Sequence, residues 1–331
     1  MIRDDASGYS HLARANDLEP GEGHRILRER CPVHTETAHD PPFHVIGRHA
    51  DVFDVLMRPD EWRNGFGVGI HEQHGGVLGT ADDPDHRRQR RVLQDAFRPS
   101  AIAALDDEIV REGESLWAAA FGDDGSGDFV RLFAFAFPAV VIAALLGVPQ
   151  ERRDDFGRWS DDIVNTLGGA DPALAEEANR QLFVLVDELV SARRVLHERG
   201  EELPDDVLSV MTLAEIEGTL DHREVRRLSQ QLLVAGHETT ASLISLMLYR
   251  LIEQPALGEQ LRASFDDSSG GHGGAAALAF MVFVLAYTPC IAALAEQRRL
   301  FGWRPTVSAL GVQLLAAWAL AVLVFQVGSR L

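Results

Sequence analysis

The sequence predicts a mainly α-helical protein made of two unlike parts. Residues 1–267 carry repeated helix-start signals and long amphipathic segments, with few extended segments. Residues 275–331 hold two uncharged apolar runs, each long enough to cross a membrane as a helix. The stretch SSGGHGG at 268–274 has the composition of a flexible linker. We therefore expect a helical part at 1–267, a Gly/Ser linker at 268–274 and a two-helix transmembrane hairpin at 275–331.

The clearest helix-start signals lie in Thr80–Phe97, TADDPDHRRQRRVLQDAF. Asp82 or Asp83 can cap the first free amides. Pro84 suits the first helical position, and we expect this helix to end near Phe97. Further helices are expected at Ala101–Phe121, Leu132–Leu146, Pro172–Arg199 and His222–Glu253, with a short extended pair around Phe43–Ile46.

Composition excludes several classes of protein. The formal net charge of −19 argues against nucleic-acid binding, because any basic patch would have to overcome the repulsion of an acidic surface. A hydrophobic content of 46% is enough for a real core. Cys31 and Cys290 lie far apart in contexts of different character, so no disulfide framework is expected. The polar N-terminus resembles no secretion signal, and residues 1–267 are expected to be cytoplasmic.

The two apolar runs predict membrane association through residues 275–331. Ala275–Ala295 spans 21 residues and Pro305–Ser329 spans 25, and either would cross a bilayer core of roughly 30 Å. The connecting EQRRLFGWR would favour the cytoplasmic side, which conflicts with a cytosolic 1–267 segment, so the orientation stays open. A buried soluble hairpin is the alternative interpretation.

His86 and Arg90 are the first candidate binding residues. They lie four positions apart on the helix predicted at Thr80–Phe97, so they project from one face. Two stacked donors of this kind can bind carboxylates. The alternative is an ordinary solvated basic face.

The stretch LVAGHETTA, Leu233–Ala241, holds the candidate catalytic residues. Gly236 inside a helix costs about 1 kcal/mol relative to alanine, and burial of Glu238 costs several times more. One interpretation is that the glycine lets a flat ligand or a diatomic molecule approach the backbone, while a threonine and a carboxylate pass protons to it. Thr239 can also bond back to the carbonyl of Ala235. An exposed polar turn is the alternative.

The two stretches together resemble a bacterial cytochrome P450, a haem-thiolate monooxygenase, over residues 1–265. DPDHRRQRRVLQDAF is similar to the family's helix in which a His and an Arg bind the two haem propionates, which implies these roles for His86 and Arg90. VAGHETTAS is similar to the family's long central helix. The resemblance therefore implies a haem cofactor, oxygen insertion into a small apolar substrate and electrons from a ferredoxin or flavoprotein reductase.

The same resemblance assigns roles within the central helix. Its Ala-Gly-x-acid-Thr pattern falls on Ala235 to Thr239. It implies that Ala235 and Gly236 border the oxygen pocket, and that Glu238 and Thr239 supply the protons for splitting the O–O bond.

The family's later motifs do not occur where the resemblance requires them. EQRR at 296–299 fits the family's Glu-x-x-Arg pattern only by coincidence, because it lies between two apolar runs. Cys290 follows Thr239 by only 51 residues and no Phe-x-x-Gly-x-x-x-Cys loop precedes it, while Cys31 lies near the N-terminus. Without a thiolate ligand, bound oxygen would not be activated in the usual way. We expect a truncated P450-like fold that is catalytically inactive.

Residues 275–331 resemble the C-terminal membrane segment of bacterial ferrous iron transport protein B. Tyr287, Pro289 and Cys290 match its Tyr-x-Pro-Cys pattern, although Cys290 is more simply an inert residue in a packing seam. No GxxxxGK[ST] loop occurs, and HEQH at 71–74 is one residue short of a zinc-protease motif, so no metal-ligating set is predicted. The alternative functions are a membrane-tethered module that binds haem or apolar ligands without catalysis, and a fragment of an iron transporter.

Overall fold

The computed structural model describes residue 9 and residues 21–37, 39–67, 75–94, 96–97, 105–121, 125–167 and 172–269. They belong to two compact units, one formed by residues 1–63 with 256–331 and the other by residues 64–255. The predicted hairpin at 275–331, with its YTPC and EQRR motifs, lies outside the described residues, as does HEQH at 71–74.

The N-terminal elements of the first unit are two helices and a hairpin. They are α2 (Gly21–Glu29), β1 (Val33–Glu36), β2 (Phe43–Ile46) and α3 (His49–Leu56). The strands are antiparallel with Val33 opposite Ile46, which confirms the predicted extended pair. Gly47 follows β2 where the chain meets α2, and a Cβ at this position would lie 2.6 Å from Leu27 Cβ. A glycine is therefore required for this close approach.

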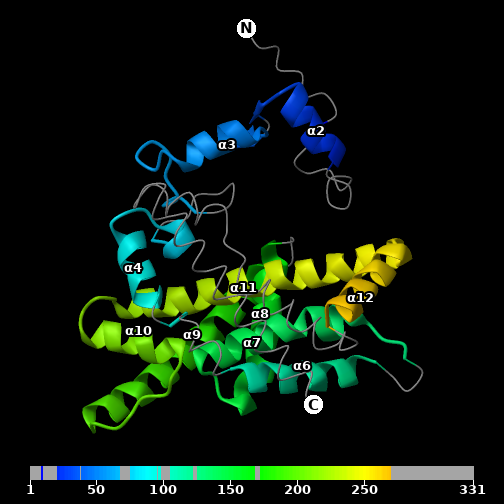
Figure 1. Ribbon diagram of the computed structural model, residues 1–331. Helices are drawn as coiled ribbons and strands as arrows, with labels where there is room; N and C mark the ends of the chain where they lie inside the picture. Colours follow the sequence, from blue (N-terminus) through cyan, green and yellow to red (C-terminus); the bar gives the residue numbers. More distant parts are fainter. Residues whose placement is uncertain are drawn as a thin grey trace. The chain divides into compact units, whose positions relative to one another are not determined.

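The described elements of the second unit are all helical (Figure 1). They are η1 (Leu78–Thr80), α4 (Asp85–Gln94), α6 (Asp106–Ala120), η2 (Val130–Ala134), α7 (Ala136–Leu146), η3 (Gln150–Arg152), α8 (Arg153–Leu167), α9 (Pro172–Glu198), α10 (Val207–Ile216) and α11 (His222–Glu253). The helical class predicted for this part of the chain is confirmed.

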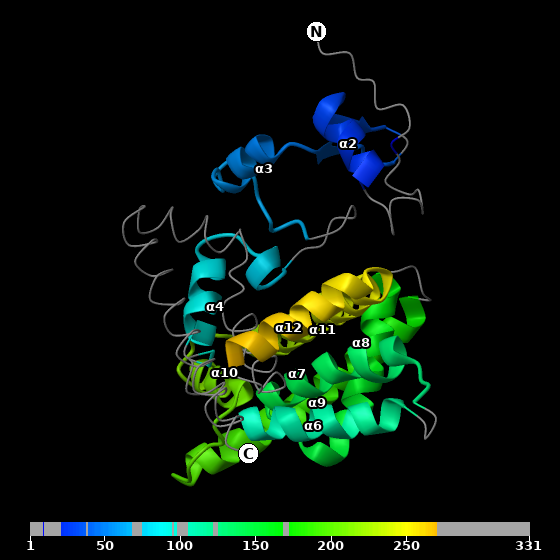
Figure 2. The same cartoon turned by 45° about the vertical axis from the view of Figure 1, so that its right-hand side comes forward.

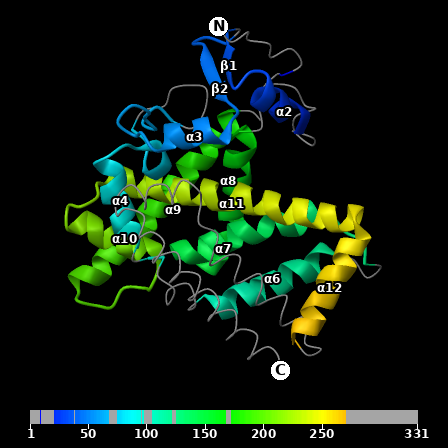
Figure 3. The ribbon, with the colours of Figure 1, turned by 45° about the horizontal axis from the view of Figure 1, so that its top comes forward.

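The core of the second unit surrounds α11. This helix packs against α7, α8, α9 and α10. Figures 1 and 3 show α6, α7 and α11 as successive layers, and Figures 2 and 3 show α4 beside α10, which it contacts. The largest buried apolar side chains are Leu146, Phe156, Leu182, Leu185, Leu208, Met211, Leu228 and Leu233. α11 is therefore the element around which this unit is built.

The sequence places the ends of α11 correctly. Asp221 caps the helix, because its carboxylate accepts from the Glu224 amide at 2.7 Å while Glu224 accepts from the Asp221 amide at 2.9 Å. This reciprocal pair is a capping box. The helix ends at Glu253, and Gln254 separates it from Pro255, which opens α12 (Pro255–Ser269). The first two residues of the linker predicted at 268–274 are thus helical.

α11 is the one described helix that is long and apolar enough to cross a membrane by length and composition. A central core helix passes the same test. The packing of α11 against α7, α8, α9 and α10 buries 17% of its most apolar stretch.

The ends of α4 differ in detail from the prediction. Pro84 lies before the first helical residue, and the helix ends at Gln94, three residues before Phe97. Asp82 does not cap it with its carboxylate, which instead accepts from the backbone amides of Asn64 at 2.8 Å and Gly65 at 3.1 Å. The Asp82 side chain binds a loop that is distant in sequence, and capping rules consider only residues next to the helix end.

Three helices of the second unit follow the sequence closely and two were missed. α6 lies within the helix expected at Ala101–Phe121, α9 ends one residue before the expected Arg199, and the helix expected at Leu132–Leu146 is α7 preceded by the π-helical turn η2. α8 and α10 were not predicted. α10 has six buried residues among its ten, so its sequence carries little of the amphipathic pattern by which helices are recognised.

Candidate functional site

α4 is fixed to the start of α11 by side chains from its middle turn. Arg88 donates to the Thr219 carbonyl at 2.6 Å and to Glu224 Oε1 at 2.5 Å. The buried Gln89 donates to the same Glu224 oxygen at 2.9 Å and accepts from the Leu78 amide at 2.8 Å. Part of the HRRQRR run is therefore structural, and sequence reasoning missed this role of Arg88 and Gln89.

Glu224 is strongly held in its ionised form. Burial opposes its ionisation, but hydrogen bonds from Arg88, from the Asp221 amide and from Gln89, with the charge of Arg88, lower its pKa to about 2. The Glu224 carboxylate thus joins α4 to the start of α11. The candidate site residues lie at other positions of these two helices.

His86 and Arg90 lie on another face of α4. His86 is half-buried, with Nδ1 3.9 Å from an Asp83 carboxylate oxygen, and Arg90 is exposed. Within the described part of the chain, Arg90 has no ion-pair or hydrogen-bond partner. The helical spacing predicted for this pair is confirmed. A role in binding propionates stays a prediction.

The predicted oxygen-binding turn of α11 has one open side. Ala235 and Thr239, four residues apart, are exposed, while Leu233, His237 and Ala241 are fully buried on the opposite side. Thr239 Oγ1 donates to the Ala235 carbonyl at 2.7 Å, which confirms the predicted back-bond. Glu238 lies between the two sides and is half-buried. The small side chain of Ala235 and the hydroxyl of Thr239 therefore share one accessible surface.

Gly236 has a packing role that the sequence interpretation did not include. A Cβ at this position would lie 3.1 Å from Ile142 Cγ1 of α7 and closer still to Cδ1. The missing side chain thus allows α11 and α7 to pack closely, whereas the sequence alone suggests that it admits a ligand. Its position beside an oxygen pocket stays a prediction.

His237 is the residue of this stretch that sequence reasoning left unassigned. Its ring contacts Ser160 Oγ of α8 through Nδ1 and the Phe135 carbonyl, between η2 and α7, through Nε2 at 2.9 Å. Burial lowers the pKa of His237, and Asp161, the Phe135 carbonyl and Glu238 only partly oppose this effect. The spacing of the sequence could have indicated that His237 is buried, because Leu233 and Ala241 lie four residues to either side of it on the same face of the helix.

Exposed apolar side chains continue the open side toward the C-terminal end of α11. Leu243 and Leu246 are both 55% exposed on this side, and Met247 is exposed at its edge. Leu248 and Ile252 line a hollow of about 660 Å³ with Phe129 and Val130 near the end of the helix, on a different side, because position 248 lies only about 20° from His237 around the helix. Apolar area of this kind marks a surface that binds a ligand or another polypeptide segment.

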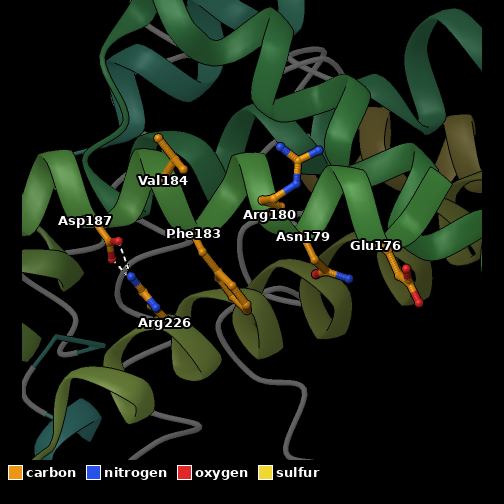
Figure 4. A pocket seen from close by; sticks show the side chains of 7 residues that line it. All are labelled: Glu176, Asn179, Arg180, Phe183, Val184, Asp187 and Arg226. Atoms are coloured by element: carbon orange, nitrogen blue, oxygen red, sulfur yellow. Dashed lines mark hydrogen bonds and ion pairs between the residues drawn. The ribbon is translucent and has the colours of Figure 1, made fainter. Parts of the chain in front are cut away.

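A second hollow lies between α9 and the first half of α11 (Figure 4). It measures about 410 Å³, and two of its charged groups are paired, since Asp187 accepts from Arg226, whose guanidinium also lies 5.9 Å from the centre of the Phe183 ring. Arg226 precedes Gly236 by ten residues, which is roughly 15 Å along the helix axis. This hollow is therefore separate from the Ala235 and Thr239 surface.

The family of the chain follows from comparison with known proteins. Residues 27–276 match the Cytochrome P450 family. The chain belongs to this family. Erythromycin C-12 hydroxylase of Saccharopolyspora erythraea is 38% identical over 238 residues, which cover 70% of this chain and 57% of that protein. Vitamin D(3) 25-hydroxylase of Pseudonocardia autotrophica is 31% identical over 249 residues, covering 71% and 58%. This P450 chain thus spans a little over half the length of these two relatives.

Solved P450 structures share the fold. The ligand-free cytochrome P450 TbtJ1 aligns with a TM-score of 0.62 and 29% identity, covering 82% of this chain and 69% of that one. The open form of the cytochrome P450 Eryk from S. erythraea aligns with a TM-score of 0.58 and 30% identity, covering 81% and 65%. The predicted P450-like helical fold is confirmed.

Proteins of the P450 family bind haem, and the described residues fit one side of this cofactor. The open surface at Ala235 and Thr239 presents no bulky side chain, and apolar side chains adjoin it. A role of His86 and Arg90 toward the haem propionates stays a prediction. Among the described residues the one cysteine is Cys31, which is buried, with Sγ 3.5 Å from the Val33 carbonyl oxygen. The fit therefore concerns the oxygen-binding side of haem only.

Proposed function

We propose that the described helices of the second unit form the oxygen-binding half of a P450 haem pocket and that this chain binds haem. The observation that carries the proposal is the open side of α11, where Ala235 and Thr239 are exposed opposite the buried His237. An apolar surface at Leu243 and Leu246 extends it. A flat apolar macrocycle suits such a surface, because contact with it removes these side chains from water.

The site residues take the following roles in this proposal. His86 and Arg90 hold the propionates. Thr239, whose hydroxyl hydrogen is bonded to the Ala235 carbonyl, keeps its oxygen lone pairs free to accept a proton-bearing group, and Glu238 exchanges protons with solvent from its half-buried position. When bound, haem would supply the oxygen activation of this family, which depends on a thiolate ligand.

The substrate class proposed for the parent activity is a small apolar molecule that is hydroxylated at a carbon atom. Two relatives are named as hydroxylases, one of erythromycin at C-12 and one of vitamin D(3) at position 25. A ferredoxin or a flavoprotein reductase would supply the electrons.

We further propose that this chain by itself binds haem without activating oxygen. No Phe-x-x-Gly-x-x-x-Cys sequence occurs in its 331 residues. A thiolate ligand donates the electron density that favours O–O cleavage. The reduced carbon-monoxide complex of the purified full chain should therefore lack the red-shifted absorption band of thiolate-bound haem. The presence of that band would contradict this part of the proposal.

Haemin titration of the full chain tests the binding site. Replacement of His86 and Arg90 together by Ala should weaken haemin binding by about tenfold or more, because charge-assisted hydrogen bonds to the propionates are lost. Arg91→Ala is the matched control, because it removes one exposed cation from the same helix. An affinity that is unchanged in the double variant, or equally reduced in Arg91→Ala, would refute the assignment.

We propose, finally, that residues 275–331 attach the chain to a membrane. The support is two uncharged runs of 21 and 25 residues. After expression, the full chain should remain with the membrane fraction when this fraction is washed with alkaline carbonate. Its release into the supernatant would favour the buried-hairpin alternative.

A further inference from the structure

The central turn of α11 is held in place from its buried side by one polar side chain. His237 has no exposed surface, and its ring is bound at both nitrogens by groups on two other elements, Ser160 of α8 and the Phe135 carbonyl at the start of α7. A fully buried polar ring with two partners is a strong geometric constraint, because moving it leaves polar groups unsatisfied.

The hydrogen-bonding roles of the ring follow from its partners. The Phe135 carbonyl can only accept, so Nε2 carries the hydrogen and donates to it. The ring is neutral when Nδ1 has no hydrogen, and Nδ1 then accepts from the Ser160 hydroxyl. The charged groups facing the ring are Asp161 of α8, 3.7 Å from Nε2, and Glu238 of α11 itself.

The geometry assigns His237 as a positioning residue for the Ala235–Thr239 turn. It fixes the rotation of α11 about its own axis, so that Ala235 and Thr239 face the open side. Positions 235 and 239 lie about 160° and 200° from position 237 around the helix, given 100° per residue. A rotation of α11 that moved His237 away from Ser160 and Phe135 would therefore also move Thr239 away from the open side.

Gly236 supports this assignment from a third direction. It packs against Ile142 of α7, at an angle of about 100° from His237 around the helix. The turn is thus bounded by α7 through Gly236 and by α8 through His237, and among its described residues Ala235 and Thr239 are the exposed ones. The inference rests on the proposed function in one respect, namely that the open side binds haem.

Hydrogen–deuterium exchange of the full chain tests the assignment directly. In His237→Leu, the amides of residues 239–243, which bond to the carbonyls of 235–239, should exchange about tenfold or more faster, as expected when buried hydrogen bonds are lost. Leu228→Ala is the control, because it removes a fully buried side chain from the same helix more than two turns away. If both variants accelerate these amides equally, His237 contributes only general stability and the inference is wrong.

Two further variants separate hydrogen bonding from ring volume. His237→Gln keeps a side-chain N–H able to reach the Phe135 carbonyl, and it should restore most of the protection that His237→Leu removes. A glutamine variant no better protected than the leucine variant would overturn the inference. Ser160→Ala is a milder change that keeps the ring and removes one partner, so it provides a test if His237→Leu does not fold. It should accelerate the same amides severalfold, and no local change would count against the inference.

Spectroscopy and haemin binding complete the test. With ¹⁵N-labelled histidine, His237 should show a protonated Nε2 and a pKa below the ordinary value of a histidine, because burial disfavours the charged ring. The opposite tautomer would overturn the inference. Haemin affinity should fall severalfold in His237→Leu and remain unchanged in Leu228→Ala. If the wild-type chain takes up no haemin, the proposed function fails, while the exchange experiment still decides whether His237 positions the turn.

Discussion

Gly236 and Ile142 meet where α11 crosses α7, and this contact explains a residue that helix propensity disfavours. A Cβ at position 236 would crowd Ile142 Cγ1 and Cδ1. The interpretation from sequence recognised the cost of a glycine inside a helix and attributed it to a ligand. The neighbour that requires the glycine comes from a segment more than ninety residues away, which one-dimensional reasoning cannot identify.

Gly236→Ala should lower the free energy of unfolding by about 1 kcal/mol. Overpacking costs roughly 1–3 kcal/mol, while the gain in helix propensity returns up to about 1 kcal/mol. In an Ile142→Val background, where Cδ1 is absent, the same substitution should become neutral or slightly stabilising. Urea unfolding of the four proteins measures this coupling. Additive effects would show that Ile142 is not the group that excludes a side chain at position 236.

His237 illustrates a signal that was present in the sequence but ambiguous. Its spacing from Leu233 and Ala241 placed it on a buried stripe, yet its partners Ser160 and Phe135 lie 77 and 102 residues away. A buried histidine without known partners has no assignable role. The role depends on the packing of α8 and α7 against α11.

At the scale of elements, a buried ion pair holds α7, α9 and α10 together. Arg193 of α9 binds Asp206, the residue that caps α10, and both side chains are almost completely buried. Asp206 also accepts from the Ser209 amide at 2.7 Å, and Arg193 donates to the carbonyl of Gly147, which ends α7 with φ of +76°. One carboxylate therefore serves as both a helix cap and the counter-ion of a buried arginine.

Asp206→Ala should destabilise the second unit by about 3–5 kcal/mol, since it leaves the Arg193 charge buried without its partner and removes the cap of α10. The control is Glu177→Ala, which breaks the exposed ion pair with Arg180 and should cost less than about 1 kcal/mol. Both values come from chemical denaturation at neutral pH. Equal losses in the two variants would contradict the structural role of Asp206.

Helix ends show where local rules succeed. The capping box of Asp221 and Glu224 and the Pro255 that follows Gln254 fix α11 at both ends, and each signal lies within four residues of the end that it defines. Asp82 lies in an equally suggestive position before α4, but it binds the backbone at Asn64 and Gly65 instead. Capping rules hold when no distant group competes for the carboxylate.

At the scale of the whole molecule, the pairing of Glu224 with Arg88 links stability to pH. The pKa of Glu224 is lowered from an ordinary value of 4.5 to about 2. A lowered pKa in the folded state stabilises the protein fully above about pH 4.5, and this contribution is lost as the pH falls toward 2. Because Arg88 is 34% exposed, we expect a contribution of about 2 kcal/mol rather than the full value implied by the shift.

Glu224→Gln should therefore lower the free energy of unfolding by about 2 kcal/mol at pH 7 and flatten its decline between about pH 4.5 and 2. Asp85→Asn is the control, because Asp85 contacts the same Arg88 from an exposed position. Its pH dependence should match that of the wild type. If the free energy of unfolding of Glu224→Gln declined between pH 4.5 and 2 as it does in the wild type, Glu224 would not be the group that causes the decline.

The amino-acid sequence by itself determined the helical class, the ends of α11, the family of residues 27–276 and the two stretches in which the candidate site lies, because these depend on local spacing and on short motifs. The tertiary structure decided which residues of those stretches are structural. Arg88, Gln89, Gly236 and His237 each pack or bond against groups distant in sequence, and Ala235 and Thr239 are left on the open side. Burial and partnership are properties of neighbours in space, and only folding determines those neighbours.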